Sequence, residues 1–322
     1  MSFRTILPIL PAPFEINHNH KIFCMGSCFA EHMVQKFQKS QFQIATSPFG
    51  IVFNALSIAK QLTTILDQEL IVEEDLVYFD HLYHSLLHHS SSSGNDPSAM
   101  INDMNQQLLE ANSDLLQSDY ILITLGTAFY YRLKDSGLIV ANCHRLPQEL
   151  FTKEQASIVE MVDGFSQLIT RLLELDNNKK IIMTVSPVRY LRDGFIQNAR
   201  SKAALLLCCE ALEKKYENVF YFPSYELLID DLRDYRFTQE DMVHPTSQTI
   251  NYIWNYFEQV FFNERTRLIN VKLERLNKKL NHRPLFKNHP SHFNIADRTK
   301  NEIEQLKLEY PEVNFTFQNI DI

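Results

Sequence analysis

Hydrophobic residues along the chain form two alternating patterns. Short unbroken apolar runs are typical of strands that are covered on both faces of a sheet. Longer segments, in which apolar residues recur every three to four positions, are typical of helices with one buried face. The apolar runs occupy residues 21–25, 42–46, 119–125, 180–185 and 219–222. Their alternation with helical segments predicts an α/β fold with a five-stranded parallel sheet and helices on both faces.

The periodic segments predict helices whose starts carry capping residues. Asn54 is suited to cap one helix, and Asp96 followed by Pro97 is suited to start the next. Thr152 and Gln155 have the spacing of a capping box, so we expect a helix from Thr152 onward. The helices are expected at 27–37, 55–66, 97–116, 152–175, 197–216, 225–232, 247–262, 265–280 and 298–310.

The remaining segments suggest how the chain is divided. Residues 69–96 have the polar composition of a loop, whereas 129–133 and 138–141 are expected to form a hairpin. The last predicted strand precedes residue 262, so we expect an α/β domain over 1–262. Residues 263–322 are then a helical C-terminal extension, acting as an appendage or as the dimerisation element of a homodimer.

Composition narrows the classes of partner. The chain has 322 residues, is 45% hydrophobic and 22% charged, and has a formal net charge of −8. This composition is globular, and the negative charge argues against nucleic acid as a partner. No apolar segment is long enough for a signal peptide or a membrane span, so we expect a cytoplasmic protein that makes no membrane contact. An odd number of cysteines, five, fits unpaired thiols.

A strand, a tight turn and a helix are predicted at 21–37, where the apolar run breaks at Gly26. Ser27 and Cys28 then lie at the helix N-terminus, where unpaired backbone N–H groups and the helix dipole favour an anion. We therefore expect the pKa of the Cys28 thiol to be lowered toward the reactive thiolate. The alternative is structural, with Ser27 as a helix cap and Cys28 as a small buried residue.

A second chemical signal is Asp241, three residues before His244, at the start of the helix predicted over 247–262. A carboxylate in this position can orient the imidazole as a general base. In a parallel sheet this segment and the turn at Gly26 both follow carboxyl ends of strands, so they share one edge. The alternative is a surface turn with a helix-capping role.

A histidine-rich segment and a loop after the predicted hairpin are expected to wall a pocket above Cys28. If the four histidines of this segment lay on one face of a helix, they could bind a metal ion. Among the carboxylates and cysteines, only Asp80 has a spacing that would add a ligand, so we expect the segment to form a polar rim beside the pocket and to bind no metal. In the loop 142–147, Asn142 and His144 are candidate substrate contacts. The four histidines are His81, His84, His88 and His89.

Six separated blocks follow one another along nearly the whole chain: GSCFA at 26–30, SPFGIVFN at 47–54, TLGTA at 124–128, NCHRLP at 142–147, SPVRYLRDG at 186–194 and DMVHP at 241–245. Together they resemble the GSCFA family of bacterial proteins, which belongs with the SGNH/GDSL hydrolases. The resemblance implies a flavodoxin-like three-layer sandwich with strand order 2-1-3-4-5. Gly26, Gly50, Gly126 and His244 are expected to converge at the carboxyl ends of its strands.

The resemblance also implies roles, position by position. In the SGNH pattern the serine of a Gly-Asp-Ser turn is the nucleophile, which places Cys28 in that role, with Ser27 as the less favoured alternative. Asp241 and His244 match the orienting acid and the general base. Gly50 matches a glycine whose backbone N–H helps to form the oxyanion hole.

The third block departs from the family pattern. It normally reads Gly-x-Asn, and the Asn side chain completes the oxyanion hole, but here Gly126 is followed by Thr127 and Ala128. Asn54 or Asn142 would have to replace that donor, or the donor is absent. The departure puts ordinary esterase activity in doubt more than it does the fold.

Two functions from different classes follow. The first is acyl chemistry without a cofactor, in which Cys28 attacks an ester or thioester of a small molecule or carbohydrate and acts as a hydrolase or an acyltransferase. Among the cysteines we expect Cys28 to be the reactive one, with Cys143 as its competitor. The second is a binding protein for a carbohydrate or another ligand that has lost turnover.

Overall fold

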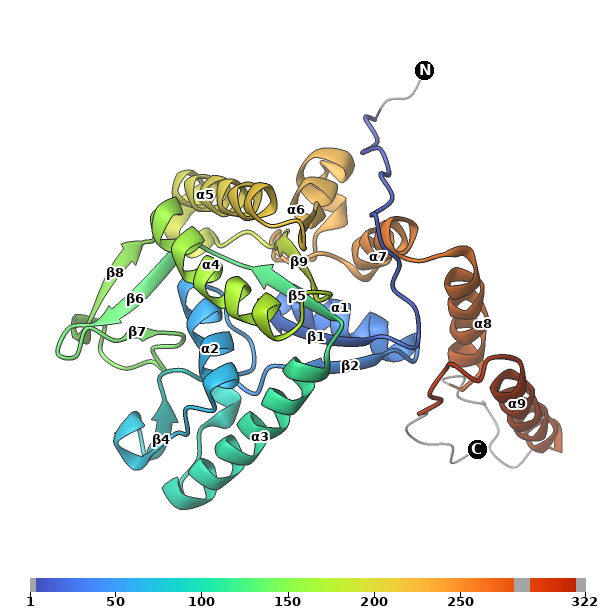
Figure 1. Cartoon of the computed structure of the whole chain (residues 1–322), viewed down its shortest axis with the longest axis horizontal. Helices are drawn as coiled ribbons and strands as arrows, with labels where there is room; N and C mark the ends of the chain where they lie inside the picture. The colour runs from blue at the N-terminus through green and yellow to red at the C-terminus, as the bar shows by residue number, and fades with distance from the viewer. Residues whose placement is uncertain (1–3, 281–289, 317–322) are drawn as a thin grey trace.

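The computed structural model describes residues 4–280 and 290–316, and a five-stranded parallel sheet lies at its centre (Figure 1). Across the sheet the strands follow the order β2-β1-β5-β9-β10. Numbered along the chain, these five strands have the predicted order 2-1-3-4-5. Their bounds are β1 (Lys21–Gly26), β2 (Gln43–Thr46), β5 (Tyr120–Leu125), β9 (Lys180–Val185) and β10 (Val219–Phe222).

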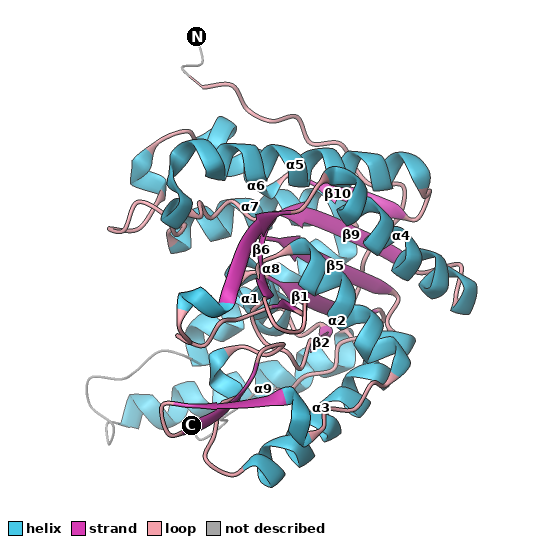
Figure 2. Cartoon of the chain, turned by 90° about the vertical axis from the view of Figure 1, so that its left-hand side faces the viewer, coloured by secondary structure: helices cyan, strands magenta, loops and turns pink. Residues whose placement is uncertain are grey.

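Helices cover both faces of this sheet and give the three layers that Figure 2 shows. One face packs against α2, α3, α4 and α5, and the other against α1 and α7. A π-helical turn, Leu227–Leu232, continues α6. The helix bounds are α1 (Cys28–Lys39), α2 (Ala55–Asp67), α3 (Pro97–Gln117), α4 (Ile158–Leu175), α5 (Gly194–Lys215), α6 (Ser224–Glu226), α7 (Ser247–Phe261), α8 (Glu264–Leu280) and α9 (Pro290–Glu309).

Helix α1 is fixed by apolar side chains at helical spacing. Phe29, Met33 and Phe37 are fully buried between the sheet and α7, and Phe37 meets the ring of Trp254 edge-on at 4.9 Å. Burying a side chain of this size stabilises the fold by roughly 1.5–3 kcal/mol. This packing holds the N-terminus of α1 in place at the end of β1.

Two small antiparallel sheets lie beside the main sheet, at the left of Figure 1. One pairs β3 (Leu76–Phe79) with β4 (Leu82–Ser85), and the other has the order β7 (Ile139–Val140), β6 (Phe129–Leu133), β8 (Phe151–Gln155). The predicted hairpin is confirmed by β6 and β7. The prediction of a loop over 69–96 is wrong for β3 and β4, because Val77 and Phe79 pack against the buried Leu86 and Val140.

The prediction of a helix from Thr152 is also wrong. Residues 151–155 form β8, in which Thr152 lies opposite Arg132 of β6. Helix α4 begins after Ser157, whose hydroxyl accepts the backbone N–H of Glu160, while the Glu160 carboxylate accepts the N–H of Ser157 at 2.8 Å. Pairing with a strand distant in sequence outweighs the local capping pattern at Thr152 and Gln155.

Helices α8 and α9, at the right of Figure 1, pack on each other through their own apolar cluster, which includes Leu273 and Leu306. Asn277 of α8 donates to the Lys39 carbonyl at 2.7 Å, which joins α8 to α1. The division at 262–263 stays a prediction, and 281–289 and 317–322 lie outside the described residues. Within the ranges described, no helix is long and apolar enough to cross a membrane.

Candidate active site

The turn after β1 places Ser27 and Cys28 at the carboxyl end of the sheet. Gly26 has a φ of +138°, and a Cβ there would overlap the carbonyl group of Thr124 on β5. Glycine alone avoids that overlap and adopts this φ without strain. Ser27 donates its backbone N–H to Thr124 O at 3.0 Å, and Cys28 is the first residue of α1. The predicted strand, turn and helix are therefore confirmed.

The two candidate nucleophiles differ in accessibility. Ser27 is 1% exposed, and its hydroxyl has no hydrogen-bond partner. Ser27 occupies the N-cap position but makes no side-chain capping bond. Cys28 is half-buried. Of the two, Cys28 is the residue that a substrate can reach.

Burial raises the pKa of the Cys28 thiol, so the expected lowering is wrong. The Lys202 ammonium acts in the opposite direction, Glu31 raises the pKa further, and the backbone N–H of Phe29 lowers it. The helix N-terminus thus acts in the predicted sense, but the loss of water around the thiol outweighs it. Cys28 is therefore a protonated thiol at neutral pH and requires a base.

His244 and Asp241 form the predicted pair. His244 Nδ1 lies 2.6 Å from Asp241 Oδ2, and Asp241 Oδ1 accepts the backbone N–H groups of Val243 and His244, each at 2.9 Å. The hydrogen bond from His244 is the main cause that lowers the pKa of Asp241 to about 2. An ionised carboxylate fixes the ring with its proton on Nδ1, which leaves Nε2 as the basic nitrogen.

The pair lies near α1, but it does not touch the thiol. Burial lowers the pKa of His32, which follows Cys28 by one helical turn, and His244 in its protonated form would lower it further. Both Cys28 and His244 are described, and no hydrogen bond joins them in this structure. The expectation that the motif order brings them within hydrogen-bond reach is therefore not met here.

Sequence reasoning missed Lys202, a residue of α5 that is 1% exposed. Its Nζ donates to Gly126 O at 2.8 Å and to Ser186 O at 2.7 Å, and burial lowers its pKa to about 7. The sequence carries a signal for this burial. Lys202 lies on the same helix face as Leu205 and Leu212, which are both buried.

The segments with the three candidate glycines are joined at this end of the sheet. The backbone N–H of Val52 donates to Gly26 O, and that of Gly126 donates to Phe53 O, both at 2.9 Å. Gly26 and Gly50 line a common cavity of about 320 Å³. Gly50 donates its N–H to Ser47 O across 3.4 Å, which is a long bond. The N–H groups of Gly50 and Gly126 thus already have carbonyl partners.

Both asparagines suggested as oxyanion donors hold structural partners. Asn54 caps α2 by accepting the N–H of Ser57 at 2.7 Å and donates to Val140 O at 3.4 Å. Asn142 donates to Ser90 Oγ at 2.9 Å and accepts the N–H of His144 at 3.0 Å. These bonds connect neighbouring segments, and in each asparagine they use the side-chain oxygen and one of the two amide N–H donors.

The histidine-rich segment and the loop 142–147 pack against each other. His144 is buried, its Nε2 lies 2.8 Å from Ser85 O, and its ring is 4.8 Å from that of His84. His88 bonds to Ser85 Oγ at 2.8 Å, and His89 donates its N–H to Phe49 O. Across the described ranges, no three histidine, cysteine or acidic residues are grouped to hold a metal ion. A substrate contact by His144 stays a prediction.

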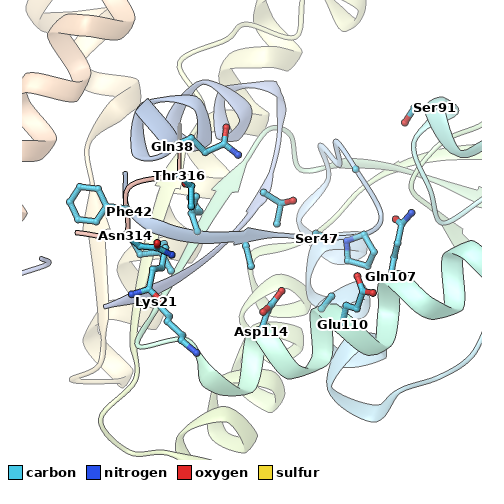
Figure 3. A pocket seen from close by; sticks show the side chains of 18 of the residues that line it. Lys21, Gln38, Phe42, Ser47, Ser91, Gln107, Glu110, Asp114, Asn314 and Thr316 are labelled. Carbon is cyan, nitrogen blue, oxygen red and sulfur yellow. The ribbon is translucent and has the colours of Figure 1, made fainter. Parts of the chain in front are cut away.

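Two further cavities differ in their relation to this site. One of about 340 Å³ borders the His244 loop and is lined by Arg189, Tyr235 and Val243. The larger, about 870 Å³, runs along the edge strand β2 between α3 and 314–316, as Figure 3 shows. Neither Cys28 nor His244 lines the larger one. The smaller cavity is therefore the one adjacent to the candidate base.

A comparison with curated proteins finds no match. A protein provisionally named a platelet activating factor, from Streptococcus pneumonia, is 12% identical, with a TM-score of 0.39 and coverage of 77% of this chain and 84% of its own. A protein provisionally named an acylhydrolase, from Bacteroides fragilis, is 11% identical, with a TM-score of 0.39 and coverage of 81% and 91%. An acetyl xylan esterase from Butyrivibrio proteoclasticus is 11% identical, with a TM-score of 0.36 and coverage of 83% and 66%.

A family model gives the stronger result. It is the model of the GSCFA family, and it matches residues 21–257, which is most of the chain. The match begins with β1, which leads into the Cys28 turn, and extends past the Asp241–His244 pair into α7. The chain belongs to the GSCFA family.

Proposed function

We propose that this protein hydrolyses or transfers the acyl group of an ester or thioester, with Cys28 as nucleophile and His244 as general base. The observation that carries the proposal is the oriented His244–Asp241 pair beside α1, the helix that starts with the accessible Cys28. The substrate class that we propose is a small or carbohydrate ester, by analogy with SGNH hydrolases. The reaction requires no cofactor.

The chemistry follows from the groups present. The proton of Cys28 Sγ passes to His244 Nε2 as sulfur attacks the carbonyl carbon, and the carbonyl π electrons move to oxygen. The bond from carbon to the leaving group then breaks, and His244 returns the proton to the departing alcohol or thiol. Water, or another hydroxyl acceptor, cleaves the resulting thioester and restores the thiol. The ring and the thiol must approach each other when substrate binds, because they are not bonded here.

A second candidate is a ligand-binding protein without turnover. It is favoured by the carbonyl and side-chain partners already held by Gly50, Gly126, Asn54 and Asn142, because an oxyanion hole needs available donors. The oriented His244–Asp241 pair is not needed for binding alone. The two candidates therefore differ in whether an acyl group becomes attached to the protein.

Burst kinetics with p-nitrophenyl acetate separate these candidates. We expect a rapid release of about one p-nitrophenolate per chain, followed by slower turnover, because the acyl-enzyme forms before water resolves it. Cys28→Ala should abolish the burst, whereas Cys143→Ala, which removes the other half-buried thiol, should retain it. Absence of a burst in all three proteins would favour the binding candidate.

The homodimer predicted through the C-terminal helices stays a prediction. Leu268 and Val271 of α8 and Leu308 of α9 are exposed apolar side chains. Analytical ultracentrifugation of the full chain tests it, since a second copy would double the sedimenting mass.

A further inference from the structure

Lys202 is a buried cation placed at the carboxyl end of the sheet. Its Nζ donates to Gly126 O and Ser186 O, the residues that directly follow β5 and β9. A buried charge is costly unless it is paired, and replacing such a lysine with an apolar residue would avoid that cost. A lysine at this position therefore needs an explanation beyond the two hydrogen bonds.

Among the described residues, no carboxylate forms an ion pair with Lys202 or acts on its pKa. Cys28 on α1 is the titratable group whose charge acts on the ammonium, and the ring of Tyr225 lies 5.8 Å away. None of the salt bridges within 4–280 and 290–316 involves Lys202. The groups that act on Cys28 are Lys202 from α5 and Glu31 from its own helix. Within the described part of the chain, the Cys28 thiol is thus the group whose ionisation would balance the buried charge.

We propose that Lys202 is a positioning residue of the active site, whose ammonium stabilises the Cys28 thiolate and the negative charge that follows it during acyl transfer. The inference rests on the proposed role of Cys28 as nucleophile. An ammonium has three N–H donors, and two are used by Gly126 O and Ser186 O. A fixed cation in a water-poor site stabilises an anion more strongly than it would in solvent. Lys202 would thus supply charge where the family's usual Asn donor is missing.

The physical coupling is reciprocal. The Cys28 thiolate raises the pKa of Lys202 and the Lys202 ammonium lowers the pKa of Cys28. The negative charge of Glu31, on the same helix, destabilises the Cys28 thiolate, whereas the positive charge of Lys202, on α5, stabilises it. Removing the ammonium should therefore lower the thiolate fraction of Cys28 below about pH 7, where Lys202 is still charged.

The test is the rate of Cys28 alkylation by iodoacetamide between about pH 6 and about pH 10, a range that spans ordinary thiol ionisation. Lys202→Gln keeps two amide N–H donors for the carbonyls and removes the charge, Lys202→Met removes both, and Lys202→Arg keeps the charge. One unit of pKa changes the thiolate fraction about tenfold, so we expect about tenfold slower alkylation near pH 6 in Lys202→Gln, where the wild-type lysine, with a pKa of about 7, is still mostly charged. Both uncharged variants should show this loss below about pH 7, the difference from wild type should shrink at higher pH as Lys202 releases its proton, and Lys202→Arg should retain at least the wild-type rate.

Two controls distinguish charge from structure. Lys179→Met removes another lysine that is 1% exposed and bonded to two carbonyls, but at the opposite end of the sheet, so it should leave Cys28 unchanged. Cys143, whose neighbouring cation is Arg192, should be alkylated equally in all proteins and serves as an internal reference. Circular dichroism identifies any variant that fails to fold. If Lys202→Met does not fold, Lys202→Gln, which keeps two N–H donors, still tests the effect of the charge.

The outcomes also separate this inference from the proposed function. An unchanged Cys28 alkylation rate below about pH 7 in folded Lys202→Gln would overturn the inference, as would an equal loss of rate in Lys179→Met. A slower rate in Lys202→Gln without any acyl burst supports the coupling between Lys202 and Cys28 but contradicts the proposed reaction. An acyl burst together with an unchanged alkylation rate supports the proposed reaction but contradicts the role of Lys202.

Discussion

Among the residues that the structure describes, one lysine is buried at each end of the central sheet, and the two lysines differ in their electrostatic partners. At the amino end, Lys179 donates to Leu116 O at 2.8 Å and to Ser118 O, and Asp176 lies 3.9 Å from its ammonium. At the carboxyl end, Lys202 also donates to two carbonyls, but no ion pair of the described residues involves it, and the charge that acts on its pKa is that of Cys28. One lysine joins structural elements, whereas the other has a charge with no permanent counter-charge.

Other polar groups show the same contrast. At the amino end, the backbone N–H of Lys21 donates to Asp119 Oδ2 at 2.7 Å, and its ammonium donates to Gln117 at 2.6 Å. At the carboxyl end, the buried hydroxyls of Ser27 and Thr124 have no hydrogen-bond partner. Buried polar groups are normally satisfied, so the two free hydroxyls beside the Cys28 turn fit a ligand-binding end, although His18 Nδ1, just before β1, is also unsatisfied.

The largest effect is expected from His244→Ala. General base catalysis contributes about 10²- to 10⁴-fold, so the acyl burst should slow by a factor in this range. The folded state should be stable to within about 0.5 kcal/mol of wild type, because the imidazole is 44% exposed. Stopped-flow kinetics and urea unfolding measure the two quantities. A burst of wild-type rate would show that another group accepts the thiol proton.

A second effect concerns the turn that holds Cys28. In Gly26→Ala, the new methyl group would overlap the Thr124 carbonyl, so we expect a loss of more than about 3 kcal/mol in the free energy of unfolding. Gly137→Ala is the matched control, because Gly137 also has positive φ but lies in open space. That variant should lose only about 1 kcal/mol. Equal losses in urea unfolding would show that β1 and β5 do not need this close approach.

The third prediction concerns the pH dependence of stability, measured in a Cys28→Ala background so that no thiolate forms. The pKa of Lys202 in the folded protein, about 7, lies below its value of about 10.4 in an unfolded chain. Below pH 7 both states are charged, and the folded state carries the full cost of the buried ammonium. Between about pH 7 and about pH 10 the folded state releases its proton first, so this cost disappears.

The Lys202-containing protein should therefore gain stability over its Lys202→Met counterpart across that window, by an amount on the order of a few kcal/mol. The corresponding gain over Lys179→Met should be smaller, because Asp176 and Asp119 favour the charged form of Lys179 and oppose the lowering of its pKa by burial. Urea unfolding at several pH values measures both differences. A larger gain for Lys179 would reverse the comparison between the two ends.

Much of the fold could be predicted because local sequence determines it. The order of the parallel strands follows the predicted topology, Asn54 caps α2, and Asp96 accepts the N–H of Ala99 at the start of α3. The helix start at Thr152 failed because a strand pairing with β6 is not visible in a local window. The sequence contains two capping-box patterns five residues apart, one at Thr152 and Gln155 and one at Ser157 and Glu160, and local sequence alone does not distinguish them.

The candidate site could be predicted only in part, for a similar reason. The Asp241–His244 pair is encoded by a spacing of three residues, so the motif was sufficient. The ionisation of Cys28 depends on how much water its surroundings exclude, and that depends on packing between distant segments. Lys202 reaches the carboxyl end of the sheet only because α5 packs against the residues that follow β5 and β9. Neither property is contained in a local motif.

The most direct test of the central claim is to locate the acyl group. After brief exposure to p-nitrophenyl acetate and acid quenching, trypsin cleavage after Lys21 and Lys36 gives a peptide that contains Cys24, Ser27 and Cys28. Tandem mass spectrometry can assign the acetyl group within it. We predict one acetyl group on Cys28 in the wild-type protein and none on this peptide in Cys28→Ala. An acetyl group on Ser27, or on Cys143 in place of Cys28, would contradict Cys28 as the nucleophile.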